Sequence, residues 1–461
     1  MAGNGTLIYM KIIISNKLFL LEVPENIKTA ICEKLTMPNP KWHENERMGR
    51  WNGETPRLLR FYERTESGLM VPRGYARQLI WLCRQCDVSY EIIDQRRSLP
   101  EVKFTFSGKL KPFQNKATHD MLKKDFGTLS APTGSGKTVM ALSMIAERKQ
   151  PSLIVVHTKE LLNQWIARIE TFLQIPKNEV GIIGGRKKAL GEKITVALVQ
   201  SLYKCAEDVS RHIGHLIVDE CHRAPSRTFT EAVTAFDCKY MLGLSATPWR
   251  RDRLSKLIFW HLGDIYYKIE AADLVKNGDI LKAEVITRET DFRPYYDPTE
   301  EYSRMLSELT EDPDRNKLIA SDVASEANNG SGISLVLSDR KRHCEDLQTL
   351  LQDRFNVSSE ILTGDIAAKQ RLDIVDRLNQ GKVKVLVATG ALIGEGFDCR
   401  QLSTLFLATP VKFNGRVLQY LGRVLRPAPG KERAKVYDYV DVNVGVLIAS
   451  GRARSRVYGN Q

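Results

Sequence analysis

Short apolar runs alternate with longer amphipathic segments from residue 106 to the end of the chain. The first half contains FGTLSA, SLIVVHT, ITVALVQ, HLIVDE and YMLGLSAT, and the second half contains ISLVLS, KVLVATG, STLFLATP and AKVYDYVD. Apolar runs of about 4–8 residues, rich in Val, Ile and Leu and separated by helix-length segments, are typical of buried parallel strands joined by crossover helices. Because the pattern occurs twice, we predict two doubly wound α/β domains in tandem.

A polar, proline-containing stretch, RETDFRPYYDPTEE, separates the two halves of this pattern. We expect the domain boundary within residues 264–291, and we place the first α/β domain at 106–275 and the second at 276–461. The basic tail, ASGRARSRVYGNQ, is expected to be mobile.

The first 105 residues follow a different pattern. KIIISNKLFLLEV predicts one or two strands, and VPRGYARQLIWLCRQC predicts an amphipathic helix. The segment between them, PNPKWHENERMGRWNGETPRLLRFYER, interleaves aromatic and basic residues. We therefore predict a small α+β domain over residues 1–105, ahead of the two parallel-sheet domains.

Length and charge refine this picture. The chain has 461 residues, of which 43% are hydrophobic, which is enough for about three globular domains. It carries 68 Lys and Arg against 55 Asp and Glu, so its net charge is +13. This excess fits a polyanionic partner, but a basic enzyme without such a partner would show the same charge.

The cysteines and the apolar runs bear on metal binding and location. Only Cys83 and Cys86 form a CxxC, and no second CxxC accompanies it, so a shared helix face explains the pair better than zinc. No apolar run approaches the roughly 20 residues of a membrane helix, and LFLLEV is too short for a signal peptide. We expect a cytoplasmic protein that does not attach to a membrane.

The stretch APTGSGKT at residues 131–138 follows a predicted strand and precedes a helical run, MALSMIAERK. This context is typical of a phosphate-binding loop, although Ala131 stands where the strict GxxxxGK[ST] pattern has glycine. Glycines let backbone N–H groups face the phosphates, the lysine supplies a charge, and the final threonine offers a hydroxyl to Mg²⁺. The candidate nucleotide-binding residues here are Thr133, Gly134, Ser135, Gly136, Lys137 and Thr138.

A second acidic element, Asp219 and Glu220, ends the run HLIVDE. At the tip of a strand, one carboxylate can hold Mg²⁺ and the next can polarise the attacking water. Alone, such a pair would more often begin a helix, but after a phosphate loop it predicts a nucleotide hydrolase. Lys137, Asp219 and Glu220 are therefore candidate catalytic residues, and Thr138 and Asp219 are candidate Mg²⁺ ligands.

Several segments together resemble the superfamily 2 helicases. DECH (219–222), SATP (245–248) and QYLGRVLR (419–426) resemble motifs II, III and VI of that superfamily. PFQ (112–114), HTKELLNQW, VALVQSL and ATGALIGEGFD are similar to its Q-type element and its motifs Ia, Ic and V. GLSATPWRRDR further resembles the XPB/UvsW-type DNA helicases and restriction-enzyme motor subunits. The resemblance covers roughly residues 106–445 and implies that both α/β domains are RecA-like.

The resemblance also implies roles for individual residues around an ATP bound between the two RecA-like domains. Arg423 and Arg426 would act as arginine fingers on the γ-phosphate. Gln419 would hydrogen-bond with His222, while Ser245 and Thr247 would report the phosphate state. Further residues implied for nucleotide binding are Phe113, Gln114, Gly396 and Asp398. The remaining member of DECH, Cys221, is expected to be a small apolar residue without a chemical role.

For nucleic acid, the resemblance implies backbone contacts, which hold a strand without reading its sequence, and 3′ to 5′ polarity. The residues implied are Thr158, Lys159, Gln200, Ser201 and Thr389. The N-terminal region adds side chains that can stack on bases or neutralise phosphates, namely Trp42, Arg47, Arg50, Trp51, Arg57, Arg60, Arg64, Arg73 and Arg77. We single out Arg47, Arg50 and Trp51, although Trp42 and Trp51 could equally pack in the core of this domain.

The leading hypothesis is an ATP-dependent DNA helicase or translocase that unwinds or remodels duplex or branched DNA, as in DNA repair or recombination. One alternative is an RNA helicase, against which the absence of DEAD argues. Another is a nucleotide-switched, DNA-binding motor subunit of a restriction or defence complex. Because no nuclease or methyltransferase motif is visible, that alternative would require partner protein subunits.

Overall fold

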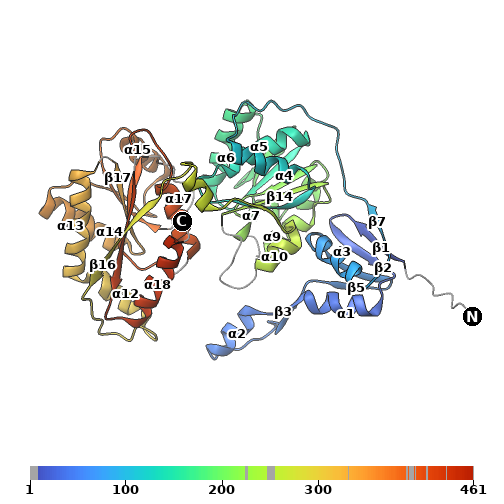
Figure 1. Cartoon of the computed structure of the whole chain (residues 1–461), viewed down its shortest axis with the longest axis horizontal. Coiled ribbons are helices and arrows are strands. Elements are labelled where there is room, and N and C mark those ends of the chain that lie inside the picture. Colours follow the sequence, from blue (N-terminus) through green and yellow to red (C-terminus); the bar gives the residue numbers. More distant parts are fainter. Residues whose placement is uncertain are drawn as a thin grey trace, which may run out of the picture. The chain divides into compact units, whose positions relative to one another are not determined.

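The computed structural model describes residues 9–223, 227–246, 255–330, 332–390, 393, 399, 401–411, 414–431 and 433–459 (Figure 1). The chain divides into two compact units. One comprises Met1–Ser130 and Lys137–Lys268, and the other comprises Ala131–Gly136 and Ile269–Gln461. In the part of the chain that is described, no helix is both long and apolar enough to cross a membrane.

The N-terminal sheet domain, residues 10–94, is a mixed five-stranded sheet in the order β5-β6-β2-β1-β7. Its strands are β1 (Met10–Ile14), β2 (Lys17–Leu21), β5 (Glu63–Thr65), β6 (Gly68–Pro72) and β7 (Tyr90–Asp94). Its helices are α1 (Glu25–Lys34), α2 (Pro40–Arg47), η1 (Arg73–Tyr75) and α3 (Ala76–Gln85). KIIISNKLFLLEV therefore forms two antiparallel strands, β1 and β2. Alternate residues of both strands are buried, as a sheet with one face on a core requires.

The segment between α1 and β5 carries the short sheet β3 (Thr36–Pro38) and β4 (Leu58–Arg60). None of the eight described side chains of α2 is buried. The CxxC lies at the end of α3, where Cys83 is buried in the domain core and Cys86 is exposed. Among the described residues, no three His, Cys, Asp or Glu side chains lie close enough together to hold a metal ion.

The first parallel-sheet domain contains eight strands in the order β11-β10-β12-β9-β13-β14-β8-β15. The strands are β8 (Phe126–Ser130), β9 (Ser152–Val156), β10 (Gly181–Gly184), β11 (Lys187–Ala189), β12 (Ile194–Leu198), β13 (His215–Val218), β14 (Tyr240–Ser245) and β15 (Ile265–Lys268). The helices are α4 (Pro112–Leu122), α5 (Lys137–Arg148), α6 (Lys159–Leu173), α7 (Val199–Leu202), α8 (Ala206–Ser210), η2 (Cys221–Arg223), α9 (Arg227–Thr234) and α10 (Ser255–Leu262). Helices α4, α5 and α6 cover one face, and α7, α9 and α10 cover the other (Figure 1). Except for the antiparallel β10–β11 pair, all neighbouring strands are parallel.

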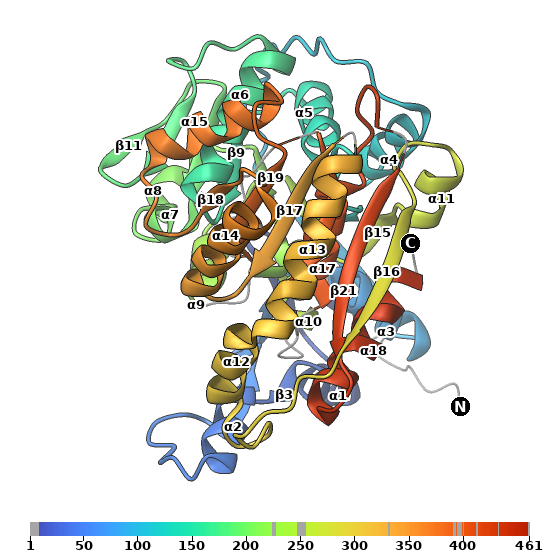
Figure 2. The same ribbon diagram turned by 90° about the vertical axis from the view of Figure 1, so that its left-hand side faces the viewer.

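The second parallel-sheet domain contains six parallel strands in the order β16-β21-β20-β17-β19-β18. These are β16 (Ala283–Thr290), β17 (Ile333–Ser338), β18 (Glu360–Leu362), β19 (Val385–Thr389), β20 (Leu402–Leu407) and β21 (Ala434–Asp441). Its helices are α11 (Ala271–Lys276), α12 (Tyr302–Glu311), α13 (Pro313–Asn329), α14 (Lys341–Phe355), α15 (Ala368–Asn379), α17 (Asn414–Val424) and α18 (Gly445–Gly459). Helices α13 and α14 cover one face of the sheet, and α17 and α18 cover the other (Figures 1 and 2). The predicted fold class, two doubly wound parallel-sheet domains after a small α+β domain, is confirmed.

The stretch RETDFRPYYDPTEE is not a plain linker, because its first three residues complete β16 inside the second sheet. One expectation about the second half was wrong. The basic tail is not mobile but forms part of the helix α18, which extends to Gly459. Arg454 on this helix is buried and pairs at 2.7 Å with Asp438 of β21. An arginine that the sequence suggests is exposed to solvent is thus buried, and its charge is paired with a carboxylate.

The N-terminal sheet domain and the first parallel-sheet domain belong to one compact unit and share part of one core. Leu257 and Trp260 of α10 belong to the same hydrophobic cluster as the inner residues of β1, β2 and α3. A Cβ atom on Gly74 would lie 2.2 Å from the Phe259 carbonyl oxygen, so the backbones of η1 and α10 are in direct contact. Only glycine allows this approach.

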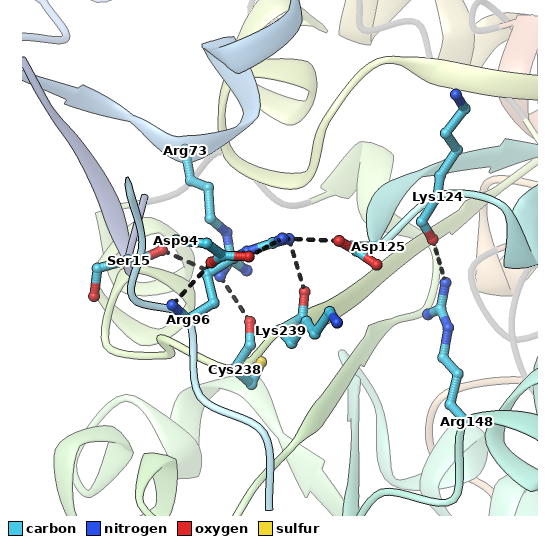
Figure 3. Close-up of polar contacts among 9 residues, drawn as sticks. All are labelled: Ser15, Arg73, Asp94, Arg96, Lys124, Asp125, Arg148, Cys238 and Lys239. Atoms are coloured by element: carbon cyan, nitrogen blue, oxygen red, sulfur yellow. Dashed lines mark hydrogen bonds and ion pairs between the residues drawn. The ribbon is translucent and has the colours of Figure 1, made fainter. Parts of the chain in front are cut away.

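Buried arginines add polar links to this joint (Figure 3). The Arg73 guanidinium donates hydrogen bonds to the carbonyl oxygens of Cys238 (2.8 Å) and Ser15 (3.3 Å). Arg96, just after the N-terminal sheet domain, forms ion pairs with Asp94 at the end of β7 (2.7 Å) and with Asp125 of the first parallel-sheet domain (2.8 Å). Arg73 was among the candidate nucleic-acid contacts, but with 2% of its surface exposed it is a structural residue.

Candidate active site

The phosphate loop, residues 131–136, joins β8 to α5, as the strand-loop-helix prediction required. Gly134 and Gly136 have φ angles of +91° and +85°, which favour glycine. Ser135 turns the loop by donating its backbone N–H and its hydroxyl to the Pro132 carbonyl, at 3.2 and 2.7 Å. Lys137 and Thr138 then form the first turn of α5, where helix N–H groups and the macrodipole favour an anion.

Strand order brings the acidic pair to the same sheet edge as this loop. In the first parallel-sheet domain β13 is separated from β8 only by β14, and all three strands are parallel, so their carboxyl ends lie at one edge. Asp219 and Glu220 directly follow β13, and Lys137 lies near enough for its charge to act on Asp219. The sheet therefore gathers the lysine and both carboxylates into one site.

Asp219 is held by two donors. Its Oδ2 accepts a hydrogen bond of 2.8 Å from the indole N–H of Trp165, and its Oδ1 accepts one of 2.9 Å from the backbone N–H of Glu220. Trp165 lies on α6 and is 1% exposed. Sequence reasoning missed Trp165, although it ends the HTKELLNQW segment. The indole fixes the orientation of the carboxylate that we predicted as a Mg²⁺ ligand.

The electrostatics of the pair depend on burial. Removal from water raises the pKa of the Asp219 carboxyl, and the neighbouring charge of Glu220 raises it further. The Trp165 hydrogen bond and the charge of Lys137 lower it. Glu220 has φ +47°, a left-handed conformation that costs a non-glycine residue about 1–3 kcal/mol and is often found at functional sites.

His222 connects this acidic element to the end of β14. Its Nδ1 lies 3.1 Å from the Ser245 hydroxyl and 3.2 Å from Glu220 Oε2. The structure thus joins motif II to motif III within one domain, because η2, which carries His222, follows β13, and Ser245 ends the adjacent strand β14. Cys221 is buried in the core beneath, and burial raises the pKa of its thiol well above the ordinary value, so it has the apolar role predicted.

The residues present fit Mg²⁺. Mg²⁺ keeps several waters and is usually held by one or two carboxylates together with substrate phosphates. Asp219 is buried beside the carboxylate of Glu220, and a divalent cation there would offset the repulsion between the two negative charges. Asp219 and the Thr138 hydroxyl would hold the ion.

The Q-type element lies in the first turn of α4. Gln114 is buried, and its Oε1 accepts a hydrogen bond of 2.9 Å from the Lys111 backbone N–H, which fixes the start of the helix. Phe113 beside it is partly exposed. An adenine-binding role for both stays a prediction.

In the second parallel-sheet domain, Gln419 and Arg423 lie on α17, and Arg426 follows its end. Lys431, which sequence reasoning did not single out, donates from its ammonium to the carbonyl oxygens of Val424 and Arg426, the latter at 2.7 Å. These bonds satisfy the carboxyl end of α17 and fix the backbone that carries Arg426. Thr247, Gly396 and Asp398 lie outside the described residues, as does the side chain of Gln419.

The predicted strand contacts lie at carboxyl ends of parallel strands. Thr158 and Lys159 follow β9, and Gln200 and Ser201 follow the adjacent β12. The Thr158 hydroxyl accepts a hydrogen bond of 3.3 Å from the Leu161 N–H, and its own proton stays available for a phosphate. Thr389 ends β19 in the second parallel-sheet domain. Nucleic-acid binding by these residues stays a prediction.

The N-terminal candidates lie on the segment that carries α2. Trp51 is 91% exposed and Arg47 and Arg50 are exposed, so Trp51 does not pack in the core. Trp42 is partly buried and lies beneath the Arg57 guanidinium, 5.3 Å from the ring centre. The two tryptophans, for which the sequence left the same alternatives open, therefore have different environments.

A phosphate loop, an acidic pair and a histidine–serine link at one edge of a parallel sheet define a P-loop nucleotide hydrolase. Residues 107–250 match the family described as type III restriction enzyme, res subunit. Residues 316–428 match the family described as helicase conserved C-terminal domain. The chain belongs to the superfamily 2 helicases and is an ATP-hydrolysing enzyme.

Individual relatives span most or all of the chain. DNA 3′-5′ translocase XPB2 of Sulfurisphaera tokodaii is 28% identical over 378 residues, which cover 75% of this chain and 84% of the relative. Helicase D10 of Escherichia phage T5, provisionally so named, is 25% identical and covers 98% of this chain and 94% of its own length. L396 of Acanthamoeba polyphaga mimivirus, provisionally named an ATP-dependent RNA helicase, is 27% identical, covering 78% of this chain and 70% of the relative.

Among solved structures, a fragment provisionally assigned as the HsdR subunit of a type I restriction enzyme from Vibrio vulnificus has a similar fold. Its TM-score is 0.57 at 18% sequence identity, over 76% of this chain and 66% of that chain.

Proposed function

We propose that the protein is an ATP-dependent DNA helicase or translocase that moves 3′ to 5′ and unwinds or remodels duplex or branched DNA. The observation that carries the proposal is the convergence of Lys137, Asp219, Glu220, His222 and Ser245 at one edge of the first parallel sheet. In that arrangement, a change at the γ-phosphate alters the surroundings of Glu220 and is transmitted through His222 to the strand β14. Such a link suits a motor better than a simple hydrolase.

Hydrolysis is assigned to this chain's own residues as follows. Lys137 and the loop N–H groups bind the β- and γ-phosphates. Glu220 orients a water and accepts its proton as the water oxygen bonds to the γ-phosphorus and the bond to the ADP oxygen breaks. Arg423 and Arg426 neutralise charge that grows on the γ-phosphate. Mg²⁺, held by Thr138 and Asp219, supplies charge neutralisation on the phosphates when bound.

DNA as the substrate is supported by three observations. The chain carries a net charge of +13. A relative that covers three quarters of it is named a DNA translocase, and that relative's stated polarity is 3′-5′. On the N-terminal sheet domain, the exposed Trp51, with Arg47 and Arg50 nearby in sequence, offers a ring for stacking and charges for phosphates. Thr158, Lys159, Gln200, Ser201 and Thr389 are proposed to grip the strand backbone.

The test is ATPase activity measured without nucleic acid and with matched single-stranded DNA, forked DNA and RNA. We expect DNA to stimulate hydrolysis strongly and RNA to stimulate it weakly, and Lys137→Ala to abolish turnover in every case. Strand separation on partial duplexes with a 3′ or a 5′ tail then gives the polarity. Equal hydrolysis with and without nucleic acid would remove the motor function from the proposal.

A second candidate is an RNA helicase, which the name of the mimivirus relative favours. Stronger stimulation by RNA than by DNA of the same sequence would establish it. Similarity to the HsdR fragment concerns the fold alone, so a role as a motor subunit of a restriction complex rests on the sequence resemblance. Stable co-purification of a nuclease subunit, together with no strand separation by the isolated chain, would favour that role.

A further inference from the structure

A pocket of about 540 Å³ lies in the joint between the N-terminal sheet domain and the first parallel-sheet domain. It is lined by residues of α1, α3 and α10 and by Asp264, which precedes β15. Its size falls within the roughly 300–1,000 Å³ of small-ligand sites. Because both walls belong to one compact unit that shares a hydrophobic cluster, the pocket is a fixed feature of that unit.

The lining combines three aromatic residues, Trp81, Phe259 and Trp260, with charges of both signs. Trp81 of α3 is 53% exposed, and the Lys34 ammonium lies 5.1 Å from the centre of its ring. Arg77 and Lys256 add two further cations, and Glu33 and Asp264 add two carboxylates. Asp264 is already engaged, because it accepts a hydrogen bond of 3.3 Å from Gln78 and lies 3.8 Å from the Arg77 guanidinium.

These features select among possible ligands. An exposed indole in a hollow presents a face for a flat ring, and base–aromatic stacking is tolerant of base identity. Three cations against two carboxylates leave one net positive charge, which suits one phosphodiester rather than a triphosphate. The Lys34 stem is flexible, so its ammonium can turn from the indole to a phosphate beside the stacked base.

We propose that this pocket binds one unpaired nucleotide of a DNA strand, with its base stacked on Trp81 and its phosphate near Lys34 and Lys256. The inference rests on the proposed action on DNA and names a contact separate from Arg47, Arg50 and Trp51. Because the pocket is built partly from α10 of the nucleotide-binding unit, a base held there moves together with the ATP site.

The experiment uses the full chain and a forked DNA whose unpaired arm carries the fluorescent base 2-aminopurine. Wild-type protein should quench the arm fluorescence as the base stacks. Trp81→Ala should weaken arm binding about 5- to 140-fold, which corresponds to the roughly 1–3 kcal/mol of base stacking at 1.4 kcal/mol per tenfold, while Trp81→Phe should retain most of it. Lys256→Gln should lower the slope of log affinity against log salt by about 0.7. The matched control, Tyr295→Ala, removes an aromatic ring that is 89% exposed in the other unit and should change nothing.

ATPase activity stimulated by plain single-stranded DNA separates failure of this inference from failure of the proposed function. If wild-type protein shows that stimulation and Trp81→Ala binds the fork arm as tightly as wild type, the pocket does not bind a base and the inference is overturned alone. If wild-type hydrolysis is not stimulated by DNA, the action on DNA itself fails. Arm binding lost in both Trp81→Ala and Tyr295→Ala would also overturn the inference, because the loss would not be specific to the pocket.

Discussion

Trp165 controls the carboxylate that we assign to Mg²⁺, and its replacement by Phe tests that role. The indole N–H donates to Asp219 Oδ2 at 2.8 Å, whereas the other oxygen accepts from the Glu220 backbone. Phe keeps an aromatic ring in the core position but removes the donor. We therefore expect Asp219 to lose its fixed orientation while the sheet and α6 remain folded.

The size of the effect follows from the nature of the bond. A hydrogen bond to a charged group contributes about 1.5–3 kcal/mol, which corresponds to roughly 12- to 140-fold in an equilibrium or a rate. Partners of metal ligands typically change metal affinity or activity by about 10- to 100-fold when they are mutated. The two values agree. We expect Trp165→Phe to raise the Mg²⁺ concentration for half-maximal hydrolysis, or to lower kcat, by at least about tenfold.

The assay measures the steady-state rate of ATP hydrolysis at a saturating DNA concentration over a range of Mg²⁺ concentrations. Ile169→Val is the matched control, because Ile169 is a buried residue of the same helix that makes no side-chain hydrogen bond. It should cost about 0.5–1.5 kcal/mol of stability and leave the Mg²⁺ dependence unchanged. A Trp165→Phe protein that is folded and shows less than a twofold change in Mg²⁺ dependence and in kcat would refute the assigned role.

Three further predictions concern the joint, its pH dependence and the second domain. Arg73→Ala should lower the free energy of unfolding by on the order of 3 kcal/mol, since the buried Cys238 carbonyl and the partly buried Ser15 carbonyl lose their donor and a cavity forms. An unchanged urea midpoint would contradict this. Burial lowers the pKa of His261 to about 4, below its unfolded value of about 6.5. The neutral, buried histidine therefore contributes fully to stability above pH 6.5, and this stability is lost as the pH falls toward 4, because only the unfolded chain binds the proton in that range. Between pH 7 and pH 5, the free energy of unfolding of His261→Leu should therefore fall by about 2 kcal/mol less than that of wild type in urea titrations. If both proteins lose the same free energy, His261 does not cause the pH dependence. Lys431→Met should lower kcat about tenfold with little change in KM for ATP, and Lys431→Arg should restore part of it; an increase in KM alone would mean that the lysine does not position Arg426.

The sequence by itself determined the elements that are buried on both faces. Each of the nine apolar runs forms a strand, because a parallel strand between two helix layers must be apolar along its whole length. The strands that it missed are short or lie at sheet edges, and they mix polar with apolar residues. β16 is an example, because Arg288, Glu289 and Thr290 at its end resemble a linker although they pair with β21. The phosphate loop and the acidic pair could also be predicted from the sequence. The loop conformation requires glycine and phosphate binding requires a lysine, whereas Mg²⁺ binding and hydrolysis require carboxylates, and all of these residues lie in short local motifs.

Only the tertiary structure decided which of these elements meet. The order β9-β13-β14-β8 places strands from separate parts of the chain side by side, and this order brings Trp165 to Asp219 and His222 to Ser245. Charged side chains were the least predictable. Arg73 and Arg454 are buried against carbonyl and carboxylate partners. The aromatic residue Trp51 shows the reverse, because it is exposed. A residue's type sets the cost of burying it, but whether a distant partner offsets that cost depends on contacts that only the folded chain makes.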